Sequence, residues 1–154
     1  MQILSTDEAR LQCEKMMKAM PSGRIFSAFF TMPAAKWILE NSPKDLKLVV
    51  RGRASDFVCG AADLDAINLI MSEGHSVFFN LNLHAKVYHF GSEILLGSSN
   101  LTTNGLNLMH QGGNIELNSV VPATPSNVTL LDRIVNSSYE VDAAVFQKLD
   151  TFLE

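Results

Sequence analysis

The 154-residue chain contains only two cysteines, Cys13 and Cys59, which lie far apart in the sequence. Two such residues do not form the disulfide framework of a small secreted domain, so we interpret both as reduced thiols without a chemical role. No run of about 18 consecutive apolar residues occurs, which excludes a membrane-spanning helix. The N-terminus carries acidic residues early and lacks the pattern of a signal peptide. These absences predict a cytoplasmic protein that does not bind membranes.

Positive charge is also scarce, because 12 Lys and Arg stand against 16 Asp and Glu and give a net charge of −4. The protein is therefore not coated with basic residues, although a local positive cleft on an acidic protein still leaves nucleic acid open as a partner. Apolar residues make up 47% of the chain and charged residues 18%. That composition suits a packed core, and the length predicts a single domain over residues 1–154.

Hydrophobic periodicity predicts alternating helices and strands. A capping box at Ser5 and Glu8 begins a helix over 6–20, and Pro33 stands where a second helix, reaching Glu40, would begin. Gly91-Ser92 joins two apolar runs into a β-hairpin. Further elements are expected at 24–31, 46–50, 76–79, 83–90, 93–96 and 113–121 (strands) and at 61–73, 127–135 and 142–153 (helices). This order predicts an α/β fold whose mixed sheet is flanked by helices on both faces.

The hairpin carries the chemically informative residues. His84 and Lys86 are two residues apart on a strand and therefore point the same way. The turn returns the chain so that Gly97, Ser98 and Asn100 lie beside them. An isolated His-x-Lys is more simply a surface pair, but its combination with Gly-Ser-x-Asn suits a bound phosphate. The ammonium supplies charge, the hydroxyl and amide donate hydrogen bonds, and the imidazole is a suitable nucleophile.

This pattern resembles the signature of the phospholipase D-like superfamily, which is His-x-Lys, then an acid, then Gly-Ser-x-Asn. The run Gly-Ser-Ser-Asn-Leu-Thr, followed by Asn-Ile-Glu-Leu-Asn at 114–118, looks like the nuclease and restriction-endonuclease branch. Two departures are visible. Gly91 replaces the usual Asp, and one residue is missing before Gly97. The chain also holds a single copy of the motif, and family members of that kind pair two chains at one site.

The resemblance implies a homodimer and a two-step reaction. His84 of one subunit forms a phosphohistidine, and His84 of the other protonates the leaving oxygen and later activates water. Lys86 and Asn100 stabilise the developing negative charge. Glu116, which alternates inward on a strand with Asn114, is the candidate for orienting the imidazole, against the plainer interpretation of a solvent-facing acid. The chemistry implied requires no metal and no cofactor.

Three further residues are expected to contact the substrate. Ser98 and Ser99 belong to the motif, and Arg51 ends a strand at the edge where α/β sheets place ligands, although Arg51 is equally well explained as a solvated charge. His84 and His89, five positions apart on a strand, point to opposite faces and are not expected to share a metal. His75 is expected at the surface.

The sequence thus favours a metal-independent phosphodiesterase that cleaves nucleic acid, with DNA preferred over RNA, in the manner of an endonuclease. A phospholipid phosphodiesterase would use the same site, but it would call for an apolar interfacial surface and usually for two motif copies. A module that binds phosphate or nucleic acid, or that dimerises, without catalysis is the remaining alternative, because the usual Asp is missing.

Overall fold

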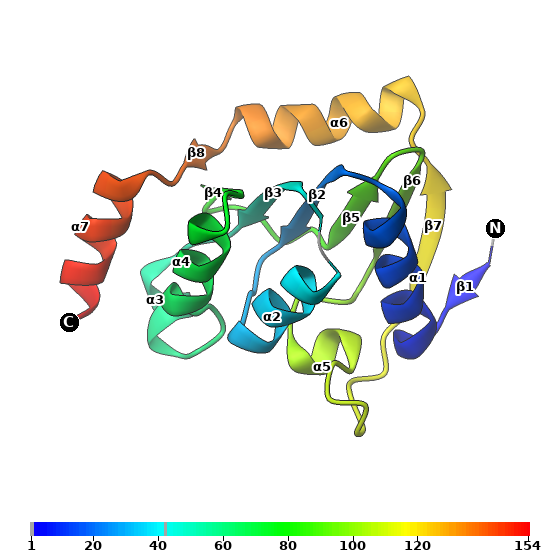
Figure 1. Cartoon of the computed structure of the whole chain (residues 1–154), viewed down its shortest axis with the longest axis horizontal. Coiled ribbons are helices and arrows are strands. Elements are labelled where there is room, and N and C mark those ends of the chain that lie inside the picture. Colours follow the sequence, from blue (N-terminus) through cyan, green and yellow to red (C-terminus); the bar gives the residue numbers. More distant parts are fainter. Residues whose placement is uncertain (1, 42) are drawn as a thin grey trace.

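A computed structural model describes residues 2–41 and 43–154 (Figure 1). Its described strands form one mixed sheet in the order β1-β7-β6-β5-β2-β3-β4-β8. Strands β2, β3 and β4 are parallel to one another, whereas the other neighbours pair antiparallel. The strands are β1 (Ile3–Leu4), β2 (Ser22–Ser27), β3 (Asp45–Val50), β4 (Ser76–Phe79), β5 (Val87–Phe90), β6 (Glu93–Gly97), β7 (Asn118–Pro122) and β8 (Tyr139–Glu140).

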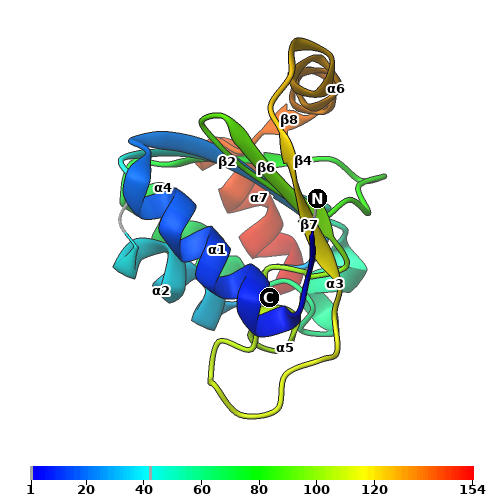
Figure 2. The same ribbon diagram turned by 90° about the vertical axis from the view of Figure 1, so that its right-hand side faces the viewer.

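Helices cover both faces of this sheet. The larger core joins the sheet to α1, α2, α4 and α5, while α6 packs its Leu131, Ile134 and Val135 on the other face. Figure 2 shows α1, α2 and α4 together on one side and α6 apart from them. The helices are α1 (Thr6–Ala19), α2 (Met32–Glu40), α3 (Ala54–Val58), α4 (Leu64–Ser72), α5 (Thr103–Leu106), α6 (Pro125–Asn136) and α7 (Ala143–Leu153).

The expected α/β architecture with a mixed sheet is confirmed. Ser5 and Glu8 form the predicted capping box of α1, and Pro33 lies in the first turn of α2. The hairpin forms with Phe90 opposite Glu93, so Gly91 and Ser92 are the two turn residues. Gly91 has a φ of +62°, a conformation that glycine adopts without the strain of a Cβ.

Three strands are shorter than predicted at the end that concerns function, and the first of them, β2, ends at Ser27 instead of residue 31. β5 begins at Val87 instead of residue 83, and β7 begins at Asn118 instead of residue 113. The main chain before β7 bonds to side chains in place of a neighbouring strand. The Thr6 hydroxyl donates to the carbonyl oxygen of Asn114 at 2.6 Å and accepts from the amide of Glu116 at 3.0 Å. The short elements β1, α3, α5 and β8 were not predicted.

The expectation that His75 lies at the surface is wrong. Its side chain is buried, and its Nδ1 accepts the amide hydrogen of Leu46 at 3.1 Å. His89 is placed similarly, because its Nδ1 accepts from Arg24 Nε at 3.1 Å while its Nε2 donates to the carbonyl of Gly91 at 3.0 Å. Both imidazoles are therefore held in the neutral form with Nδ1 unprotonated.

These two histidines make the fold sensitive to mild acid. Burial lowers the pKa of His75 and of His89 below the ordinary 6.5. The unfolded chain then binds protons first, so their stabilisation is complete above pH 6.5 and is lost as the pH falls from 6.5 through the folded pKa. We expect the free energy of unfolding to fall in this window, above the range in which carboxylates titrate. Urea titrations of the wild type and of the double variant His75→Asn/His89→Asn, which keeps acceptors but cannot titrate, test this. An equally steep loss in the variant would contradict it.

Candidate phosphate site

The strand register brings the motif residues to one edge of the sheet. β2 ends at Ser27 beside Val50, the last residue of β3, and Val87, the first residue of β5, lies next to them opposite Phe26. Gly97 at the end of β6 faces Asn118 at the start of β7. The segments that follow or precede these residues all leave the sheet at the same edge. His84, Lys86, Ser98, Asn100 and Glu116 therefore share it, as predicted.

His84 and Lys86 contact each other directly. The Lys86 ammonium donates to the carbonyl oxygen of His84 at 2.8 Å and lies 3.0 Å from His84 Nδ1 and 3.5 Å from Nε2. The imidazole is exposed, whereas the lysine is half-buried. Because the ammonium donates hydrogen bonds and cannot accept them, the contact favours the imidazole tautomer with Nδ1 unprotonated.

Several groups of this edge influence the charge on Lys86. Burial lowers the pKa of Lys86, the carboxylate of Glu116 counteracts the shift, and the guanidinium of Arg51 adds to it. These effects show that Glu116 and Arg51 lie within electrostatic reach of the ammonium. The site thus combines one acid and two cations at one end of the sheet.

Ser98 and Glu116 form the second pair. The Ser98 hydroxyl donates to Glu116 Oε1 at 2.9 Å and accepts the amide hydrogen of Leu117 at 3.0 Å. The Ser98 amide donates to the carbonyl oxygen of Leu117 at 3.1 Å. Glu116 is therefore fixed at this edge through Ser98, and it makes no hydrogen bond to His84 of the same chain within the described residues.

Asn100 lies beside Ser27, a residue whose place next to the motif the sequence did not reveal. Ser27, fully buried at the end of β2, places its Oγ 3.2 Å from Asn100 Oδ1, donates to the carbonyl of Phe29 at 2.6 Å and accepts the amide hydrogen of Leu101 at 2.9 Å. No pattern in the sequence links two positions 73 residues apart, although a hydroxyl ending a buried strand was a usable signal.

Gly105 in α5 supports Asn100 from the other side. A Cβ at Gly105 would overlap the carbonyl oxygen of Asn100 and approach its amide nitrogen to 2.9 Å. We expect Gly105→Ala to displace Asn100 and to destabilise the fold by about 1–3 kcal/mol, the usual cost of overpacking. Thermal unfolding monitored by circular dichroism measures the loss. Gly112→Ala is the comparison, since a Cβ at Gly112 meets nothing within 4 Å, although its φ of +67° adds some backbone strain. An unchanged melting temperature in Gly105→Ala would contradict the close contact.

Two residues predicted to contact substrate are engaged elsewhere. Ser99 is fully buried; its hydroxyl accepts from Asn118 Nδ2 at 2.9 Å, and its carbonyl accepts from the hydroxyl of Tyr88 at 2.7 Å. Arg51 forms a two-pronged ion pair with the buried Asp56, at 2.6 and 2.9 Å, and its guanidinium lies 5.0 Å from the centre of the Phe29 ring. Ser99 is thus a buried packing residue of the motif. Arg51 influences this edge through its positive charge, which lowers the pKa of Lys86.

Gly91, which stands where the signature that the chain resembles has an acid, lies at the opposite end of β5 from Lys86. It occupies the hairpin turn, and a Cβ there would come within 2.8 Å of the Met20 side chain. A larger residue would not fit this turn without movement. The glycine in place of an acid therefore affects the packing of the hairpin turn, and it does not change the residues at the phosphate edge.

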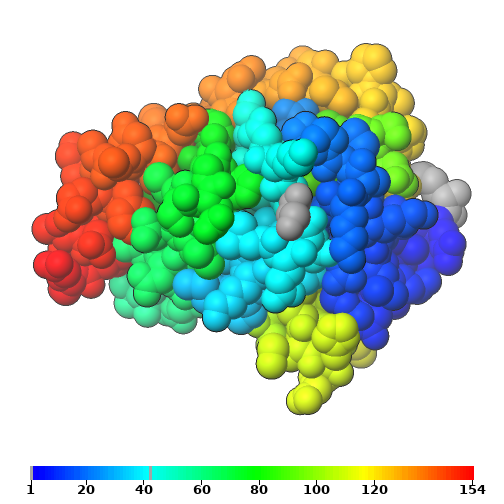
Figure 3. All heavy atoms as spheres, viewed as in Figure 1, coloured from blue at the N-terminus to red at the C-terminus, as the bar shows by residue number. Residues whose placement is uncertain are grey.

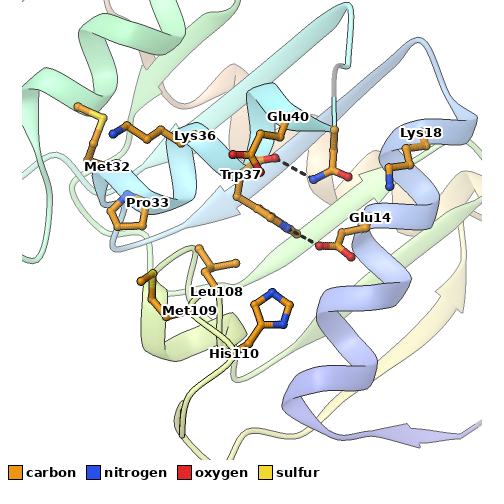
Figure 4. A pocket seen from close by; sticks show the side chains of 11 residues that line it. Glu14, Lys18, Met32, Pro33, Lys36, Trp37, Glu40, Leu108, Met109 and His110 are labelled. Atoms are coloured by element: carbon orange, nitrogen blue, oxygen red, sulfur yellow. Dashed lines mark hydrogen bonds between the residues drawn. The ribbon is translucent and has the colours of Figure 1, made fainter.

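A hollow of about 660 Å³ lies away from the motif (Figure 4). Residues of α1, α2 and the segment after α5 line it. The indole of Trp37 is part of this lining, and its Nε1 donates a hydrogen bond to the Glu14 carboxylate at 2.8 Å. None of the predicted phosphate residues lines it. Within residues 2–41 and 43–154, no three His, Cys, Asp or Glu side chains are grouped to hold a metal ion, and no helix has the length and apolar character to cross a membrane.

No protein-family profile and no curated protein matches the chain. Solved structures do. A phosphatidylserine synthase from Haemophilus influenzae superposes with a TM-score of 0.65 at 13% identity, over 99% of this chain and 42% of that one. TrmBL2, an archaeal chromatin protein with a novel mode of DNA binding, superposes with a TM-score of 0.59 at 9% identity, over 91% of this chain and 52% of its own. The chain spans about half of these proteins or less, and at such identities the likeness shows a shared α/β fold and nothing about activity.

Proposed function

We propose that this protein is a metal-independent phosphodiesterase that cleaves nucleic acid at a site completed by two copies of the chain. The observation that carries the proposal is the convergence of the His84–Lys86 pair, the Ser98–Glu116 pair and Asn100 at one edge of the sheet. A nucleophile, a cation, an acid and an amide gathered there match the requirements of a phosphoryl-transfer site.

In the first step, a phosphate group of the substrate binds at this edge. Its oxygens attract the Lys86 ammonium, which contacts the imidazole of His84. His84 attacks phosphorus, forming a P–N bond while the P–O bond to the leaving strand breaks. His84 of the second subunit gives its proton to the leaving oxygen. Lys86 and Asn100 stabilise the negative charge that develops on the phosphoryl oxygens.

In the second step, the imidazole of the second subunit removes a proton from water. That water attacks phosphorus, the P–N bond breaks, and His84 of the first subunit is regenerated. Glu116 orients an imidazole in the assembled site. The Ser98 hydroxyl that now binds Glu116 at 2.9 Å keeps this carboxylate at the site edge.

Nucleic acid is the substrate we favour, with DNA before RNA. The motif context Gly-Ser-Ser-Asn-Leu-Thr resembles the nuclease branch, and one protein with this fold, TrmBL2, is a DNA-binding chromatin protein. The same neighbour favours a second candidate, a DNA-binding module without catalysis. Phosphatidylserine synthase, which also has this fold, points to phospholipid chemistry as a third.

Incubation of the protein with plasmid DNA and with single strands in the presence of EDTA separates these candidates. Cleavage that survives chelation and is lost in His84→Ala supports the nuclease. DNA binding without cleavage, unaffected by that substitution, supports the module. Release of headgroup from phospholipid vesicles without cleavage of DNA would overturn the assignment of substrate.

A further inference from the structure

The hollow between α1, α2 and the segment after α5 holds charged side chains of both signs. Its volume is about 660 Å³, and its lining includes Glu14 and Lys18 of α1 and Lys36 and Glu40 of α2. In Figure 3, α1 (blue), α2 (light blue) and the yellow-green segment after α5 meet on the face turned to the viewer. The volume falls in the range of sites that bind small molecules.

Glu14 is oriented at this hollow by a buried partner. Its Oε2 accepts the hydrogen of Trp37 Nε1 at 2.8 Å, and Trp37 is only 7% exposed. A carboxylate can accept several hydrogen bonds. Over residues 2–41 and 43–154, the bond from Trp37 is the only one that the Glu14 side chain makes, so its Oε1 is available to a ligand.

Lys18 lies one helical turn after Glu14. Side chains four positions apart lie on the same face of a helix, with about 5–6 Å between their Cβ atoms. Within the part of the chain that the structure describes, the Lys18 ammonium forms no ion pair, either with Glu14 or with another acid. A carboxylate and an ammonium therefore lie side by side at the hollow without binding each other.

Apolar side chains line the rest of the hollow. Figure 4 shows Met32, Pro33 and Met109 toward the end opposite Lys18, with Leu108 between them and Glu14. Met109 is 62% exposed, which is unusual for so large an apolar side chain. A ligand that fills the hollow would therefore meet charges at one end and an apolar surface at the other.

The segment that carries Leu108 and Met109 is held firmly in place. Asn107 and His110, which flank the two, have φ values of +50° and +59°, a region that residues other than glycine adopt uncommonly. The carbonyl oxygen of Asn107 accepts from the buried Arg10 at 3.0 Å. The apolar wall is thus formed before a ligand arrives, which reduces the entropy lost on binding.

We propose that this hollow binds a free α-amino acid with an apolar side chain. Glu14 accepts hydrogen bonds from the ammonium of the ligand, Lys18 donates to its carboxylate, and its side chain packs against Leu108 and Met109. The two charges of an α-amino acid flank a single carbon atom, so they match the adjacent charges on α1. A phosphate group would meet the carboxylate of Glu14 as well as the ammonium of Lys18, and a peptide separates its terminal charges.

Titration of the full chain with L-leucine tests the inference. Trp37 is the only tryptophan in the sequence, so its fluorescence reports on the hollow directly. We expect a saturable change in emission. Leucinamide, which lacks the carboxylate, and isocaproate, which lacks the ammonium, should each bind about 10-fold more weakly or worse, because each loses a charged hydrogen bond. Calorimetry on the same solutions detects binding that leaves the emission unchanged.

Two variants locate the binding. Glu14→Gln keeps an acceptor for the Trp37 indole but removes the negative charge, and Lys18→Met removes the positive charge. Each should weaken the binding of L-leucine by about 10-fold or more, with unchanged circular dichroism. Lys15→Met is the matched control, because Lys15 is an exposed lysine of α1 that does not line the hollow, and it should bind L-leucine as the wild type does.

Several results would overturn the inference. One is the absence of saturable binding of L-leucine, L-methionine and L-phenylalanine up to millimolar concentrations. Equal affinities for leucine, leucinamide and isocaproate would contradict the recognition of both charges, and tighter binding of leucyl-leucine would assign the hollow to peptides. Binding that is unchanged in Glu14→Gln and Lys18→Met would place the ligand elsewhere. The titrations contain no DNA, so their outcome is independent of the proposed nuclease activity.

Discussion

His84→Ala should reduce phosphodiester cleavage by about 10⁴-fold or more, because removal of a nucleophile leaves only binding and electrostatic stabilisation. The imidazole is exposed and its hydrogen-bond contacts are to Lys86, so its loss should leave the fold intact. The measurement is the initial rate of plasmid nicking in EDTA, at equal concentrations of folded protein.

His110→Ala is the matched control for this result, since it removes another exposed imidazole, one outside the motif. It should retain nearly full activity. A covalent test complements the rate measurement: brief incubation with a ³²P-labelled substrate, followed by alkaline denaturation, should leave label on the wild type but not on His84→Ala. Equal cleavage by wild type and His84→Ala would refute the nucleophile.

Arg51→Met should lower the free energy of unfolding by about 3–5 kcal/mol, because it leaves a buried carboxylate without its partner. Asp56 is almost completely buried, and both of its oxygens accept from Arg51. Methionine preserves much of the aliphatic packing near Phe29. The loss in the free energy of unfolding therefore reflects the missing ion pair more than the missing aliphatic contacts of the Arg51 side chain. Chemical denaturation at pH 7 measures it.

The pH dependence of this variant distinguishes the ion pair from ordinary packing. Arg51 holds the pKa of Asp56 below its ordinary 3.8 in the folded protein. The pair therefore stabilises the wild type fully above pH 3.8 and less as the pH falls from there through the folded pKa, so the gap between wild type and variant should narrow in acid. Arg53→Met is the control, because Arg53 is exposed and its side chain donates to the carbonyl oxygen of Leu81. If Arg51→Met loses activity but no stability, Arg51 serves the substrate directly.

The sequence predicted the architecture well because hydrophobic periodicity and turn chemistry are local signals. The capping box of α1, the proline of α2 and the Gly91-Ser92 hairpin each depend on a few adjacent residues, and each appears in the structure. The hairpin in turn explains why the two halves of the motif could be placed at one edge from sequence alone.

Contacts between residues far apart in the sequence could not be predicted from these local signals. Ser99 belongs to the motif, yet it is buried and its hydroxyl accepts a hydrogen bond from Asn118. Arg51 forms an ion pair with Asp56, which lies on the unpredicted helix α3. Ser27 lies beside Asn100 only because β2 is next to β5 in the sheet. Such neighbours are decided by the order of the strands, which periodicity does not determine.

The hydroxyl of Thr6 joins the first helix to Asn114 and Glu116, across 108 and 110 residues of sequence. Closing such distant contacts is slow and comes after local structure in most folding reactions. A partly folded or newly synthesised chain would therefore carry the complete motif and still have no organised acid beside it. If Glu116 acts as proposed, its carboxylate would take its place beside the motif only in the finished fold.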